Sequence, residues 1–251
     1  MNSLCCSRAL LACCLLLSAL PDVARAQAGP PLITNDPDTP GDGQWEINLA
    51  VAGSRSARIW DLSAPDVDIN YGWGERVQLS VHLPWNHLQD SGWASGTGPV
   101  ELAVRWRFLD EEDAGLSMAI QPHWSRSWSE RARRIGLAPV HDEFSLPLQV
   151  SRHAGDAVVG LEVGRNFIAS EPDEWQAGVF WSRDCAANWQ CLAEINTIWA
   201  GGDVSSTLNL GGRRSLGKQW NLLGSLGRVF SGIEPGATIF YLGFQYLYPA
   251  Q

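Results

Sequence analysis

Twelve stretches of alternating apolar and polar residues follow one another between residues 45 and 248. Successive side chains of a β-strand point to opposite faces, so this period of two predicts strands with one apolar and one polar face. From Val77 to Trp85, for example, every second residue is apolar and the residues between are polar or small, apart from Pro84. The pattern therefore predicts an all-β chain with an even number of strands.

The connections between these stretches are of two kinds that alternate along the chain. Short turns are expected at 72–75, 109–115, 153–156, 184–190 and 213–219, and loops at 53–57, 86–98, 125–141, 169–174, 200–203 and 231–236. The longest loop, 125–141, is rich in arginine. Short periplasmic turns on one side and longer extracellular loops on the other are typical of a transmembrane, antiparallel, up-and-down β-barrel.

Tryptophan is unusually abundant, with 13 residues against 7 of phenylalanine, and most of it lies at strand ends. A tryptophan ring favours the interface between membrane and water, because its body is apolar and its indole N–H needs a partner. One set is predicted at the loop ends and another at the turn ends: Trp60, Trp85, Trp124, Trp175 and Trp199, then Trp45, Trp106, Trp181 and Trp220. These two rows predict an aromatic girdle at each interface.

A soluble, secreted β-sandwich or closed barrel is the alternative fold. Its polar face would meet water and would normally carry many lysines and glutamates, whereas charged residues make up only 18% of this chain. After residue 26 no apolar run approaches the roughly 20 residues that a spanning helix needs. The alternation thus favours a membrane barrel with its apolar face toward lipid.

Residues 1–26 resemble a secretory signal peptide. Arg8 supplies the positive charge, Ala9–Leu20 form an apolar run, and Ala24-Arg25-Ala26 is a small-x-small cleavage site. A lipoprotein signal ending at Cys13 or Cys14 is less favoured, because it would cut within the apolar run. We expect cleavage near Ala26, export to the bacterial outer membrane, and a barrel over residues 44–251. The Pro- and Asp-rich lead 27–43 is either a periplasmic tail or a plug in the lumen.

Cys185 and Cys191 remain after removal of the signal and flank a predicted turn. In an oxidising compartment they can form a disulfide across it. A redox or metal-binding pair is disfavoured, since neither a CxxC spacing nor a neighbouring histidine is present.

Several stretches of the chain resemble a known family of bacterial outer-membrane proteins. Residues 30–50 (PPLITNDPDTPGDGQWEINLA) carry the most specific match, and 64–85, 99–112, 191–195 and 239–246 add to it. The family is the MetA-pathway-of-phenol-degradation, transporter-like family. The resemblance implies an outer-membrane barrel for uptake of small, often aromatic or hydrophobic compounds, and it supplies no catalytic residues. Pro249-Ala250-Gln251 depart from the terminal aromatic of many such barrels, so Tyr246 and Tyr248 are expected to serve in assembly.

In a membrane barrel the polar face lines the lumen. The lumen-lining candidates are Glu46, Asp66, Asp68, His82, Glu101, Arg105, Arg107, His123, Glu162 and Glu194. These charges could form a ring that selects solutes, or they could form ion pairs that close the lumen. Structural pairing is favoured. Glu101, Arg105 and Arg107 share one strand face and are the best candidates for a network.

Enzymatic activity is disfavoured. Ser80 with His82, or Ser125 with His123, could be offered for a lipid hydrolase, but residues two apart on a strand are separated by roughly 6.6 Å and no nucleophile motif surrounds them. Motifs for cofactors or metals are not found, and the formal charge of −9 disfavours a nucleic-acid partner. The favoured function is a passive channel for small molecules. Its outer surface is expected to contact the lipid of the outer membrane. A closed structural or adhesive barrel is the alternative.

Overall fold

The computed structural model describes residues 29–57, 59–90, 92–232 and 235–249. Its fourteen strands are β1 (Trp45–Ser56), β2 (Ile59–Trp73), β3 (Val77–Gln89), β4 (Trp93–Thr97), β5 (Val100–Leu109), β6 (Ser117–Ile120), β7 (His123–Arg126), β8 (Glu143–Ala154), β9 (Ala157–Ile168), β10 (Glu174–Ala186), β11 (Trp189–Ala200), β12 (Asp203–Ser215), β13 (Trp220–Ser231) and β14 (Thr238–Tyr248). Two short helices, α2 (Glu111–Ala114) and α3 (Glu130–Arg134), lie in connections. Within these described ranges, no helix is long and apolar enough to cross a membrane.

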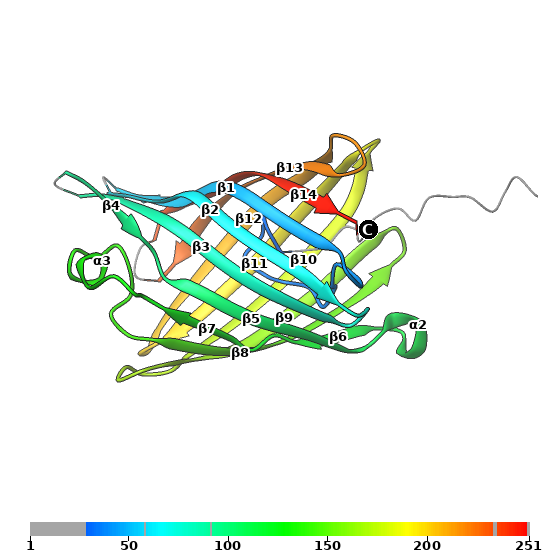
Figure 1. Ribbon diagram of the computed structural model, residues 1–251, viewed down its shortest axis with the longest axis horizontal. Helices are drawn as coiled ribbons and strands as arrows, with labels where there is room; N and C mark the ends of the chain where they lie inside the picture. Colours follow the sequence, from blue (N-terminus) through cyan, green and yellow to red (C-terminus); the bar gives the residue numbers. More distant parts are fainter. Residues whose placement is uncertain (1–28, 58, 91, 233–234, 250–251) are drawn as a thin grey trace, which may run out of the picture.

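The strands form a closed antiparallel barrel (Figure 1). Closure is made by the first and last strands, which pair from Trp45 opposite Tyr248 to Arg55 opposite Thr238. β4 only prolongs the β3 hairpin, and β6 and β7 are two halves of one wall strand, since both pair with β5 and β8. The wall therefore has twelve strands, as the alternation predicts.

The fifth wall strand, expected to be continuous over 116–124, is interrupted at Gln121 and Pro122. Proline has no N–H to donate to a ladder. The neighbouring groups still pair, because Gln121 N donates to Pro147 O over 3.1 Å and Val104 N donates to Pro122 O over 3.1 Å. The interruption thus leaves the wall joined on both sides.

The segment 86–98, expected to be a loop, is mostly strand. β3 continues to Gln89 and turns back into β4, with Trp85 opposite Thr97. Small apolar residues from the 125–141 loop pack against this hairpin; they are Ala132, Leu137 and Ala138, against Leu88 and Ala94. The hairpin and α3 therefore form an ordered structure at the end of the barrel that we term the loop end (Figure 1).

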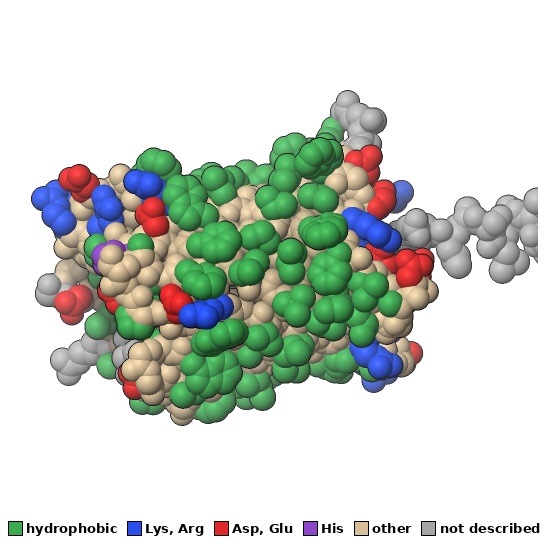
Figure 2. All heavy atoms as spheres, turned by 90° about the horizontal axis from the view of Figure 1, so that it is seen from below, with side chains coloured by type: hydrophobic (Ala, Val, Ile, Leu, Met, Phe, Trp, Pro, Cys, Tyr) green, Lys and Arg blue, Asp and Glu red, His purple; other side chains and the backbone are tan. Residues whose placement is uncertain are grey.

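The distribution of side chains is inverted relative to a water-soluble protein. Val179 and Leu49 on the outer surface are 56% and 53% exposed, whereas Gln149 and Gln245 are 0% and 1% exposed inside. Figure 2 shows the outer surface as a broad apolar band, with charged side chains gathered toward its two ends. Apolar residues outside and polar residues inside are the arrangement that a lipid-spanning barrel requires.

Register brings aromatic residues of neighbouring strands together at the strand ends. At the turn end, Trp45 lies opposite both Tyr248 and Tyr71. At the loop end, Phe144 lies opposite both Trp124 and Phe167. The location of these rows at the two membrane interfaces stays a prediction. The predicted signal peptide lies outside the described residues.

Cys185 and Cys191 form a disulfide, with their Cα atoms 5.8 Å apart. The bond joins the end of β10 to the start of β11 across the turn, as the sequence predicts.

Candidate functional site: the barrel lumen

Residues 29–43, termed the N-terminal segment, precede β1 and contact side chains that face the lumen. The segment is tied first to the turn end, where Gly43 N donates to Gly72 O over 2.9 Å and Thr39 Oγ1 donates to Glu75 O over 2.7 Å. Gly72 must be glycine, because a Cβ there would overlap the carbonyl group of Gly41. The end of the segment is thus locked against the β2–β3 turn.

Glu194 on β11 holds the other part of the segment. Its buried carboxylate accepts hydrogen bonds from Ile33 N over 2.8 Å and from Thr34 N over 2.7 Å. Asn209 Nδ2 donates to the same carboxylate over 2.9 Å. Three donors on one carboxylate satisfy a charge that would otherwise be costly to bury.

Apolar and small residues complete this attachment. Leu32 packs against Phe180 and Leu192 in the one apolar cluster that joins the segment to the wall among the described residues. Gly178 leaves room for the segment, since a Cβ there would overlap the Thr34 hydroxyl group. The segment therefore touches β10 and β11, far along the chain from β1, which directly follows it.

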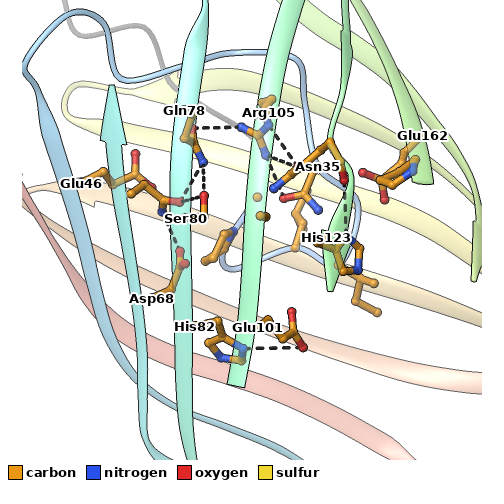
Figure 3. A pocket seen from close by; sticks show the side chains of 18 of the residues that line it. Asn35, Glu46, Asp68, Gln78, Ser80, His82, Glu101, Arg105, His123 and Glu162 are labelled. Atoms are coloured by element: carbon orange, nitrogen blue, oxygen red, sulfur yellow. Dashed lines mark hydrogen bonds and ion pairs between the residues drawn. The ribbon is translucent and has the colours of Figure 1, made fainter. Parts of the chain in front are cut away.

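Arg105 on β5 links the segment to the opposite part of the wall. Its Nη1 donates to Asp38 O over 2.7 Å, and Nε and Nη2 donate to Gln121 Oε1 over 3.1 and 2.8 Å. The Asp36 carboxylate lies 3.9 Å from Nη1. Arg105 is 5% exposed, so its guanidinium is held by protein groups rather than by solvent (Figure 3).

Between the segment and the loop end lies a polar cavity of about 240 Å³, termed the upper cavity. Its acidic side comes from β1 and β2, where Asn48 Nδ2 donates to both Glu46 Oε1 and Asp68 Oδ2 over 3.1 Å. Asn70 Nδ2 also donates to Asp68, over 2.7 Å. The amide groups hold two carboxylates side by side on adjacent strands (Figure 3).

His82 on β3 lies between two further carboxylates. Its Nε2 is 3.1 Å from both carboxylate oxygens of Asp66, and its Nδ1 is 3.8 Å from Glu101 Oε1. The imidazole ring therefore spans the space between β2 and β5.

A second and larger cavity, about 1070 Å³, lies toward the turn end and is termed the lower cavity. Asp36 and Asp38 of the N-terminal segment line it, whereas Leu32, Ile33 and Asn35 line the upper cavity. The two cavities share no lining residue. The N-terminal segment therefore lies between them.

The structure brings most of the sequence-predicted lumen residues together. Eight line the upper cavity: Glu46, Asp66, Asp68, His82, Glu101, Arg105, His123 and Glu162. Glu194 lies under the segment instead. Arg107 lies near the turn end, where Nε is 2.7 Å from Asp110 Oδ1 and Nη2 donates to Glu75 O over 2.9 Å.

The expected network of Glu101, Arg105 and Arg107 does not form. Each of the three has a partner on another strand, a turn or the N-terminal segment, and residues two apart along a strand are separated by roughly 6.6 Å. Glu101 faces His82, Arg105 faces Gln121, and Arg107 faces Asp110. Glu101 and Arg105 thus pair with groups on neighbouring parts of the wall, and Arg107 pairs with the turn that follows β5, so the pattern of β5 alone does not reveal the partners.

Sequence reasoning on charged residues passed over the neutral amides. Gln149 Nε2 donates to Gln121 Oε1 over 2.8 Å and to Glu162 Oε2 over 2.9 Å, linking two lumen groups. Both glutamines lie on the inward phase of their strands, so the alternation alone could have identified them. The positions of Asn35 and Asp36 in the lumen could not be identified in this way, because the N-terminal segment has no alternating pattern.

The serine and histidine pairs do not have the geometry of a hydrolase. Ser80 Oγ donates to Asn70 Oδ1, and both ring nitrogens of His82 face carboxylates. His123 Nδ1 lies 3.4 Å from the backbone oxygen of Gln121. A hydrolase needs its serine within hydrogen-bond reach of the histidine, and these serines are not so placed. Among the described residues, no group of three or more potential ligands could hold a metal ion.

A closed twelve-stranded barrel with an apolar exterior and a polar lumen defines the class of transmembrane β-barrels. Solved structures with a similar fold are outer-membrane proteins. An outer-membrane channel from Pseudomonas putida F1 is 15% identical, with a TM-score of 0.68 over 86% of this chain and 98% of that one. The KdgM porin is 12% identical (TM-score 0.58; 81% and 99%), and the NanC porin is 7% identical (0.58; 80% and 98%). At these identities the similarity establishes the fold alone.

No family model matches the sequence, and no curated protein matches it.

Proposed function

We propose that this protein is a channel of the bacterial outer membrane that lets small molecules cross by diffusion. The observation that carries the proposal is the pair of polar cavities inside a membrane-type barrel, about 240 and 1070 Å³ in volume. A structural barrel has no need of hydrated space along its axis, whereas a diffusion path consists of it. The signal peptide predicted over 1–26, with cleavage near Ala26, fits export to that membrane.

The N-terminal segment forms the constriction of this channel. It separates the two cavities, and Glu194 and Arg105 hold it from opposite parts of the wall. These contacts of residues 29–43 support the hypothesis that the lead is a plug in the lumen over the hypothesis of a periplasmic tail. Passage of a solute requires it to move past or displace this segment.

The lining offers hydrogen-bonding groups to solutes with polar parts. Carboxylate, amide, imidazole and guanidinium groups line the upper cavity, together with apolar residues such as Leu32, Ile33 and Pro147. We also propose that the chain belongs to the MetA-pathway-of-phenol-degradation, transporter-like family. This membership implies uptake of aromatic or hydrophobic compounds. Swelling of liposomes in a panel of sugars, amino acids and phenols would test it.

Ion conductance in a planar bilayer tests the channel itself. We expect discrete, reproducible current steps from the full chain without its signal peptide. Replacing residues 29–38 by a glycine–serine linker of equal length should enlarge the steps, because the anchors to Glu194 and Arg105 are removed. The double variant Cys185→Ser/Cys191→Ser alters the turn end without touching the segment, and its steps should match those of the unchanged protein.

A closed structural or adhesive barrel is the second candidate. The hydrogen bonds from Ile33 N and Thr34 N to Glu194 favour it, since they fix the segment in the lumen. Absence of steps from both the unchanged protein and the linker variant would establish the closed barrel and exclude the channel.

A further inference from the structure

Three arginines at the loop end have their guanidinium groups over aromatic rings. Arg55 Cζ lies 5.0 Å from the centre of the Trp60 ring, and Arg126 Cζ lies 4.8 Å from that of Trp128. Arg165 Cζ lies 5.0 Å from the Phe167 ring and 5.4 Å from the Trp175 ring. Among the described residues, the turn end has one such arginine, Arg214, which lies over Trp189. The arrangement is thus concentrated at one end of the barrel.

Two of these arginines belong to one continuous surface on β7, β8, β9 and β10. Register places Trp124 opposite Phe144, Phe144 opposite Phe167, and Arg165 opposite Trp175. The strand phase that carries these rings is the outward, lipid-facing one. We term this surface the arginine–aromatic patch: Trp124, Arg126, Phe144, Arg165, Phe167 and Trp175.

The guanidinium groups of the patch are accessible and only partly paired. Arg126 and Arg165 each have 43% of their side-chain surface exposed. Arg126 Nη1 is 3.4 Å from Asp142 Oδ2, and Arg165 Nη2 donates to Asp173. A guanidinium group has five N–H donors in a planar fork, so these contacts leave donors on both arginines directed away from the aspartates.

Large aromatic side chains are exposed around these arginines. Trp128 beside Arg126 is 65% exposed, and Trp175 beside Arg165 is 49% exposed. Figure 2, which views the barrel from below, shows charged side chains at the left, loop-end side of the apolar band rather than within its middle. A ligand for this surface therefore needs an anionic group for the arginines and apolar chains for the rings.

We propose that the arginine–aromatic patch is a binding site for a phosphorylated, multiply acylated glycolipid of the outer leaflet. Planar guanidinium groups bind phosphate oxygens in pairs, and aromatic faces support both the guanidinium group and the acyl chains. A free phosphate ion would use the arginines but not the exposed rings. The concentration of such arginines at the loop end matches a lipid that is confined to one leaflet.

Native mass spectrometry of the folded barrel in detergent tests the proposal with diphosphoryl lipid A as the probe. The unchanged protein should retain lipid A at low micromolar concentration. Lipid A stripped of its phosphates should bind at least about ten-fold more weakly, because the charge-assisted hydrogen bonds from the guanidinium groups to the phosphate oxygens are lost. This comparison uses only the unchanged protein, so it stands whether or not any variant folds.

The double variant Arg126→Gln/Arg165→Gln should weaken lipid A binding by about ten-fold or more. Its matched control is Arg214→Gln, which removes the arginine over Trp189 at the turn end and should leave binding unchanged. A difference in gel migration between boiled and unboiled samples establishes that each protein is folded.

Three outcomes would overturn the proposal. One is equal binding of lipid A with and without phosphates. Another is an equal loss in Arg214→Gln and in the double variant, which would show general attraction to charge. The third is displacement of lipid A by millimolar inorganic phosphate, which would show a site for a free anion rather than for a lipid.

Discussion

At the scale of single residues, carboxylates act as hydrogen-bond acceptors for backbone N–H groups that no strand partner reaches. Glu194 does so for Ile33 and Thr34 in the lumen. Glu111 does so at the turn end, where Oε1 accepts from His153 N over 2.8 Å and Oε2 lies 2.8 Å from His153 Nδ1. In both places an acidic side chain supplies the acceptor that a neighbouring strand would otherwise supply.

Glu194→Gln should loosen the N-terminal segment, because the amide nitrogen faces an N–H group where an acceptor is required. Losing a hydrogen bond to a charged group costs about 1.5–3 kcal/mol, which corresponds to an at least about ten-fold increase in exposure. A thiol probe at Thr34→Cys would measure this as faster labelling. Glu101→Gln, which removes a carboxylate from the same lumen but not from the segment, is the control; similar acceleration in both variants would contradict the role of Glu194.

The contact between Glu111 and His153 should depend on pH. Partial burial would raise the pKa of Glu111, but the hydrogen bonds from the His153 side chain and backbone outweigh it and lower the pKa below its usual value. A lowered pKa in the folded state stabilises the fold above the unfolded value, about 4.3, and this stabilisation is lost as the pH falls through the lowered value. The amide resonance of His153 in micelles should therefore show a shift below pH 4.3 that is missing in Glu111→Gln.

At the scale of elements, alternation sets which face of each strand meets lipid. Val104 and Arg105 are neighbours on β5, yet the first is 44% exposed and the second 5% exposed. The sequence predicted this phase because the period of two is local to each strand. It did not predict the division of the fifth wall strand into β6 and β7, nor the β3–β4 hairpin, because both depend on pairing between strands.

Val104→Asp should impair assembly, since it places a charge on the lipid-facing side of a wall strand, at a cost somewhat below the roughly 2–4 kcal/mol of an arginine or lysine near the midplane. Gln121→Asp should be tolerated, because a carboxylate still accepts from Arg105. Folding of both variants into liposomes, followed by gels with and without boiling, measures the folded fraction. Equal tolerance of both would mean that Val104 does not face lipid and that the assigned phase of the strands is wrong.

At the scale of the whole molecule, the lumen carries an excess of negative charge. Five carboxylates and one guanidinium group line the upper cavity, together with two histidines. The lower cavity has five carboxylates against two arginines and one lysine. The sign remains negative in the upper cavity even when both histidines carry a proton, and Arg105 is already held by Gln121 and Asp38.

A conducting barrel should therefore select cations over anions, because fixed negative charge in a narrow path concentrates counter-ions. The reversal potential across a potassium chloride gradient measures this selectivity. Asp66→Asn/Asp68→Asn should reduce it, whereas Asp203→Asn at the start of β12 should not. Anion selectivity of the unchanged protein would show that the lumen charges do not govern passage.

The sequence predicted the barrel more completely than its interior. Strand number, phase and the disulfide all follow from local patterns, and eight of the ten proposed lumen residues gather around one cavity. The contacts of Glu194 with Ile33 and Thr34 could not be predicted, because 160 residues separate Glu194 from Thr34 and the segment has no period. The alternation of apolar and polar residues carries no information on long-range hydrogen bonds made by an irregular segment.

The position of the N-terminal segment also means that the beginning of the chain fills the interior of the barrel. Residues 31–34 bind β10, β11 and β13, whereas the same chain continues directly into β1. β1 and β14 are the last pair needed to complete the ring. The segment therefore lies inside the ring that this seam closes, so the chain wraps its wall around its own beginning.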